Sequence, residues 1–119
     1  MKMPTKDELM GICMMLNGMA AYYRQADRTF SERAIALRGK LHPFTDPSVT
    51  EIHFDLTHEE AMTLDKAFNA YIQYLRFVSQ RPERERVLEQ AAALQRRLGF
   101  NSKADGEQVP GNSLPFSFS

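Results

Sequence analysis

Histidines and carboxylates gather in one short stretch of this 119-residue chain, TEIHFDLTHEE at residues 50–60. It contains two of the three histidines and four acidic residues. Imidazole and carboxylate groups bind zinc and manganese, and they also act as general acids and bases. One hypothesis is therefore a metal or catalytic site formed by these residues: Glu51, His53, Asp55, His58, Glu59 and Glu60.

The same stretch is also the one place where apolar and polar residues alternate strictly. A period of two is typical of a β-strand with one buried and one solvated face. Ile52, Phe54 and Leu56 would then form the strand-pairing face, and His53 and the acids would face water. The two glutamates that end the stretch fall in the first turn of a helix, where the helix dipole favours acids. We therefore predict no catalytic residue, metal or cofactor here.

Sulfur-containing side chains form a second cluster, because Met10 and Met14 flank the single cysteine, Cys13. Soft sulfur ligands suit Cu(I). Methionine also fills irregular cores and adaptable interfaces, and burial of a thiol in apolar surroundings raises its pKa. The sequence contains no glycine-rich phosphate loop, GxSxG elbow, HExxH or paired CxxC motif. We interpret the sulfur cluster as packing and predict that the protein is not an enzyme.

Helical segments are expected to position these residues. Thr5, Thr29 and Thr57 each precede a glutamate by three residues, which is the spacing of a capping box. Gly99 is predicted to end the last helix, and the short link around Pro82 predicts that the last two helices form an antiparallel hairpin. Apolar residues recur at helical spacing over residues 6–26, 29–41, 58–80 and 82–98.

The sequence thus predicts an all-α fold, a four-helix bundle-like domain over residues 1–100 with one short β-segment at about 50–56. Glycine, proline, serine and asparagine dominate residues 101–119, which predicts a flexible C-terminal tail. An isolated strand leaves backbone groups unpaired. Three partners for it stay open: the same strand of a second subunit in a homodimer, a foreign chain, or the tail, in which Leu114, Phe116 and Phe118 recur at period two.

The 15 basic and 15 acidic residues balance, but they are segregated along the chain. Residues 42–75 carry one basic and six acidic residues, whereas residues 76–103 carry seven basic and three acidic residues. Either the two blocks pack on each other within the domain or they form surfaces that steer a partner. The arginines of the fourth helix allow a nucleic-acid-binding regulator as an alternative function, although interleaved glutamates dilute their positive surface.

The favoured function is a non-enzymatic, small protein-binding or regulatory module, of the kind that bacterial or phage accessory genes encode. Aromatic residues outside the core, placed beside arginines, are typical of interfaces. The longest apolar run, residues 12–16, is far below the roughly 20 residues of a transmembrane helix. We expect a cytoplasmic location, the host cytoplasm if a phage encodes the protein, and no membrane partner. The predicted protein-binding residues are Phe77, Arg86, Arg97, Leu114, Phe116 and Phe118.

Overall fold

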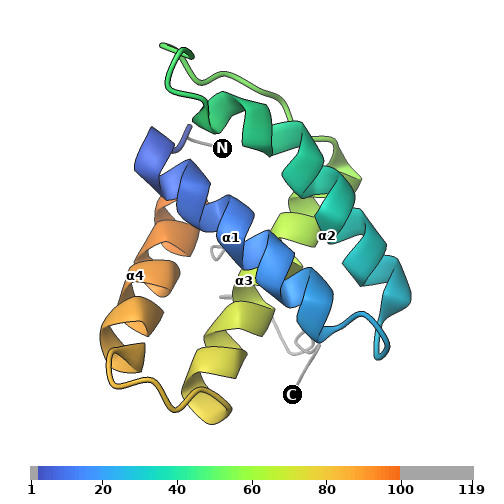
Figure 1. The fold of residues 1–119 in the computed structure, drawn as a ribbon, viewed down its shortest axis with the longest axis vertical. Helices are drawn as coiled ribbons and strands as arrows, with labels where there is room; N and C mark the ends of the chain where they lie inside the picture. The colour runs from blue at the N-terminus through green and yellow to red at the C-terminus, as the bar shows by residue number, and fades with distance from the viewer. Residues whose placement is uncertain (1–2, 100–119) are drawn as a thin grey trace. The chain divides into compact units, whose positions relative to one another are not determined.

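The protein is mostly helical in the part described by its computed structural model, residues 3–99 (Figure 1). These residues contain four α-helices, one short 3-10 helix and no β-strand, so the all-α prediction is confirmed. No helix among them is both long and apolar enough to cross a membrane. The elements are α1 (Lys6–Tyr22), α2 (Arg28–Leu41), η1 (His42–Thr45), α3 (His58–Phe77) and α4 (Arg84–Arg97).

The described chain divides into two compact units, residues 3–67 and residues 68–99, and the boundary lies inside α3. In the first unit, α1 packs against α2 and η1 (Figure 1). Their facing sides are apolar, and each large side chain buried there contributes about 1.5–3 kcal/mol. The buried apolar residues are Leu9, Ile12, Cys13, Met15, Leu16, Met19 and Ala20 of α1 and Phe30, Ala34, Leu37 and Leu41 of α2.

The start of α1 contains the predicted capping box. The Thr5 hydroxyl accepts a hydrogen bond from the Glu8 N–H at 3.2 Å, and the Glu8 carboxylate accepts one from the Thr5 N–H at 2.9 Å. The helix ends at Tyr22 instead of residue 26, because a turn follows directly. Beyond this turn the buried Ser31 hydroxyl donates to the Ala20 carbonyl at 2.7 Å. This bond satisfies a carbonyl in the last turn of α1, where intrahelical partners run out.

The cap of α2 differs from the prediction. Asp27 is the N-cap residue, and its Oδ1 accepts from the Phe30 N–H at 3.1 Å. Its Oδ2 accepts from the Lys66 ammonium at 2.8 Å. The Thr29–Glu32 capping box is therefore wrong, since the helix already includes Thr29, and an aspartate two residues earlier does the capping.

The second unit contains the C-terminal part of α3 and all of α4. The Gln95 side-chain amide donates to Asn69 Oδ1 at 2.8 Å, and the Arg84 guanidinium donates to the Ser79 carbonyl at 3.0 Å. Asn69 and Gln95 are 26 residues apart in the sequence, whereas Ser79 and Arg84 are only five apart. An antiparallel helical hairpin brings both kinds of pair into contact, the close pair at its turn and the separated pair farther along the helices. The prediction of a hairpin is thus confirmed for this unit.

Two helix boundaries in this unit differ from expectation. α3 ends at Phe77 rather than residue 80, and α4 begins at Arg84 rather than Pro82. Pro82 instead lies in a turn, closed by the Arg84 N–H donating to the Arg81 carbonyl at 3.2 Å. Gly99 follows the C-cap residue of α4 and has a φ of +93°, a backbone conformation that favours glycine. Its predicted role at the end of the helix is thus confirmed.

Candidate functional site

Residues 50–57 precede α3, and in the described structure they have no regular secondary structure. The predicted β-segment is therefore not present as a strand. The predicted alternation is present: Phe54 is buried and packs against Phe44 with ring centroids 5.6 Å apart, and Ile52 and Leu56 are half-buried. These side chains anchor an extended loop instead of pairing with another strand. The side chains of the opposite face are exposed: Glu51, His53 and Asp55.

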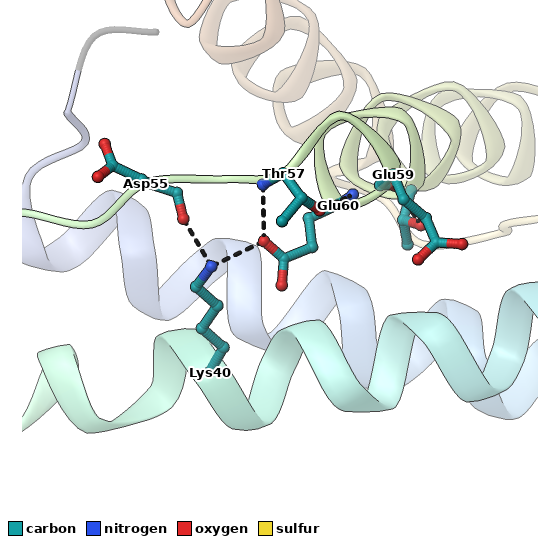
Figure 2. A network of polar contacts seen from close by, with 6 residues as sticks. Lys40, Asp55, Thr57, Glu59 and Glu60 are labelled. Atoms are coloured by element: carbon teal, nitrogen blue, oxygen red, sulfur yellow. Dashed lines mark hydrogen bonds and ion pairs between the residues drawn. The ribbon is translucent and has the colours of Figure 1, made fainter.

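Lys40 of α2 supplies hydrogen bonds to this segment (Figure 2). Its ammonium donates to the Asp55 carbonyl at 2.6 Å and to Oε1 of Glu60 at 2.7 Å. The same carboxylate oxygen accepts from the Thr57 N–H at 2.9 Å, and the Thr57 hydroxyl accepts from the Glu60 N–H at 3.1 Å. The predicted Thr57–Glu60 capping box is thus confirmed. The hydrogen bond from Lys40 is the main cause that lowers the pKa of Glu60.

A second lysine binds the chain just before this segment. The Lys6 ammonium, at the start of α1, donates to the carbonyl of Asp46 at 2.8 Å and to the carbonyl of Val49. Unpaired carbonyls of a non-regular segment need such donors or water. Lys6 and Lys40 together thus bind three carbonyls of residues 46–55 from two helices of the same unit.

The acidic and histidine residues of the segment 51–60 do not converge on a metal site. Glu60 is held by Lys40, and Glu59 forms an ion pair with Arg33 at 2.6 Å. His53 and His58 are exposed. Within residues 3–99 no group of three histidine, cysteine, aspartate or glutamate side chains could hold a metal ion. Two of the carboxylates that suggested chemistry, those of Glu59 and Glu60, instead link the start of α3 to α2.

The sulfur cluster of α1 lines an open pocket of about 160 Å³. Cys13 is buried, whereas Met10 and Met14 are 48% and 73% exposed. Burial raises the pKa of the Cys13 thiol, and the positive charge of Arg38 opposes this shift without reversing it. The thiol is therefore protonated at neutral pH. The pocket around it was not predicted from the sequence. Its lining residues come from α1, α2 and η1: Met10, Cys13, Met14, Asn17, Arg38, His42 and Thr45.

Three of the predicted protein-binding residues lie on the unit of residues 68–99. Phe77, the last residue of α3, is 73% exposed, and the adjacent Val78 is 47% exposed. Arg86 and Arg97 are exposed on α4. Their separation of 11 residues places them on one face of α4, about 17 Å apart along its axis. Leu114, Phe116 and Phe118 lie outside the described residues.

Two further arginines of this unit have structural partners. Arg81 donates to Oε2 of Glu83 through Nε at 3.1 Å and Nη2 at 2.8 Å, and this contact lowers the pKa of Glu83. Arg84 donates to the Ser79 carbonyl, as described above. Both arginines thus stabilise the turn between α3 and α4. The positive charge displayed by α4 itself comes from Arg86, Arg96 and Arg97.

Comparison of the chain with protein-family models, with curated proteins and with solved structures gave no match.

Proposed function

We propose that this protein is a non-enzymatic binding module that acts, as a regulator, through protein–protein contacts. The observation that carries the proposal is the exposed pair Phe77 and Val78 at the end of α3. Burying a phenylalanine side chain contributes about 1.5–3 kcal/mol, and this chain leaves most of the Phe77 surface in water. Exposed aromatic residues of this kind often supply much of the free energy of binding at interfaces.

The exposed face of α4 adds the polar part of such an interface. Starting from Arg86, the residues one, two and three helical turns farther along α4 are Gln90, Ala93 and Arg97. All four side chains are exposed. This row contains no acidic residue, and alanine at its centre leaves room for a partner to approach. Arginine is enriched in protein interfaces because its planar guanidinium binds carboxylates in two-point contacts.

A comparison of variants tests the proposal. Proteins captured from the native host by the wild-type chain should be lost with Phe77→Ser, because truncation of an aromatic hot spot costs about 2 kcal/mol or more, roughly 30-fold in affinity. Met62→Ser is the matched control, since Met62 is also exposed on α3 but lies in the other unit. Equal capture by all three proteins, each shown to be folded by circular dichroism, would remove Phe77 from the proposed surface.

The exposed arginines of α4 favour nucleic-acid binding as a second candidate function. The unit of residues 68–99 carries six arginines and three glutamates, a net charge of +3. Phosphate contacts by arginine make affinity fall steeply with salt. A titration of duplex DNA and of RNA at low and at physiological ionic strength tests this candidate. Absence of binding at low salt excludes it, and salt-dependent binding that Arg86→Gln weakens supports it.

A further inference from the structure

The pocket between α1, α2 and η1 has the volume of a single large side chain. At about 160 Å³ it is close to the cavity of roughly 150 Å³ that holds one benzene molecule, and it is below the roughly 300–1,000 Å³ of small-molecule sites. Two methionines form its apolar wall, and methionine adapts its shape to different partners. The pocket is therefore suited to one inserted side chain rather than to a whole cofactor or metabolite.

The surroundings of this pocket specify the charge of its occupant. No acidic residue lines it, and residues 9–22 of α1 carry no charge. Arg38 is half-buried at the pocket, and in residues 3–99 no carboxylate lies within ion-pair distance of its guanidinium. By contrast, Lys40 and Arg33 of the same helix both have glutamate partners. A cationic group next to apolar walls is complementary to an apolar side chain that has a carboxylate beside it.

We propose that this pocket receives one large apolar side chain from an acidic segment of a partner protein, and that a carboxylate of that segment pairs with Arg38. Met10 and Met14 close on the inserted side chain, and the neutral Cys13 thiol contributes a further nonpolar contact. This surface is separate from the one proposed on residues 68–99, so neither proposal depends on the other.

Synthetic peptides and methionine-methyl NMR test the proposal on the full chain. The probe is Gly-Ser-Asp-Leu-Asp-Ser-Gly, and the matched peptides replace leucine by alanine or both aspartates by lysine. Protein labelled with ¹³C at its methionine methyl groups is titrated to millimolar peptide, because one side chain and one ion pair give weak binding. Signals are assigned with Met10→Leu and Met14→Leu, and Met62 serves as an exposed methionine outside the pocket.

The leucine probe should shift the signals of Met10 and Met14 but not that of Met62. The alanine and lysine peptides should bind at least several-fold more weakly, and Arg38→Gln should weaken the probe about tenfold by removing a charge-assisted hydrogen bond. Arg28→Gln is the control on the same helix, since Arg28 is highly exposed and lies outside the pocket lining; it should leave the affinity unchanged.

Several results would overturn the proposal. They are the absence of shifts at Met10 and Met14 at millimolar probe, equal binding of the acidic and the lysine peptides, or full affinity in Arg38→Gln. Stronger binding by a peptide of residues 111–119 than by the probe would identify the chain's own tail as the occupant. Shifts of the Met14 signal upon simple dilution of the protein would identify a second copy of the chain instead.

Discussion

Replacing Lys40 by methionine should loosen the segment that joins η1 to α3 while leaving the flanking helices intact. The ammonium of Lys40 donates to the Asp55 carbonyl and to the Glu60 carboxylate, so one substitution removes both bonds. Methionine retains most of the apolar stem of lysine, which keeps the packing of that stem largely unchanged. The measured loss therefore reports on the ammonium group.

The magnitude follows from the distances and the exposure. The two bonds measure 2.6 and 2.7 Å, and the side chains of Lys40 and Glu60 are 36% and 28% exposed. Hydrogen bonds to charged groups contribute about 1.5–3 kcal/mol when buried, whereas exposed ion pairs contribute about 0–1 kcal/mol. For this half-exposed arrangement we expect Lys40→Met to lower the free energy of unfolding by about 1.5 kcal/mol near pH 7.

The pH dependence of the effect has a definite sign. Lys40 lowers the folded-state pKa of Glu60 below its usual value. A carboxyl group with a depressed folded pKa stabilises the fold above the unfolded pKa, about 4.3 for glutamate, and loses that contribution as pH falls through the folded pKa. The difference between Lys40→Met and the wild type should therefore shrink below about pH 4, where only the bond to the Asp55 carbonyl remains to be lost.

Urea unfolding at pH 7 and pH 3 measures this effect, and hydrogen exchange of the Thr57 amide localises it to the start of α3. A double-mutant cycle with Glu60→Gln isolates the ion pair, because glutamine can still accept from the Thr57 N–H. Arg28→Met is the control: its pair with Glu32 is 83% and 69% exposed, and its loss should cost less than about 0.5 kcal/mol. Unfolding free energies for Lys40→Met and wild type that agree within error at pH 7 would refute the reasoning.

Three further changes probe other contacts. Hydrogen bonding from Lys66 is the main cause that lowers the pKa of Asp27, so its carboxyl should titrate by NMR below the usual value near 3.9, and Lys66→Met should move it upward. Ser31→Ala should cost about 1–3 kcal/mol in urea unfolding, because the buried Ala20 carbonyl loses its donor. Gly99→Ala should destabilise α4 by about 1 kcal/mol, since φ of +93° strains an L-residue; an unchanged thermal midpoint would contradict this.

Local signals in the sequence predicted several features of the structure correctly. The capping boxes at Thr5 and Thr57 depend on side chains three residues apart, so spacing alone identifies them. Gly99 ends α4 through its own backbone freedom. The inward and outward alternation of residues 51–56 is likewise correct, because a period of two reflects which side chains meet the core whether or not a neighbouring strand is present.

Features set by distant residues were not predictable in this way. Asp27 caps α2 while its second oxygen binds Lys66, 39 residues away, and nothing local distinguishes it from the Thr29 candidate. The pocket around Cys13 needs residues from three elements, so the sequence shows only its α1 side. For a related reason the histidines and carboxylates of residues 51–60 form no metal-binding group in the described structure, since Arg33 and Lys40 of α2 bind two of the carboxylates.

The lysine contacts also change the argument for a partner chain. A strand at 50–56 would have needed a second strand to satisfy its backbone, and the tail, a second subunit or a foreign chain could have supplied one. Lys40 lies in the last turn of α2, where the helix dipole already favours a cation, and it supplies a donor to the Asp55 carbonyl. Lys6 lies in the first turn of α1, where the dipole disfavours a cation, and its bonds to two carbonyls offset that cost. Because residues 50–56 form no strand in the described structure, the expectation of a pairing strand no longer supports a partner chain, whereas the exposed apolar side chains of Phe77, Met10 and Met14 still do.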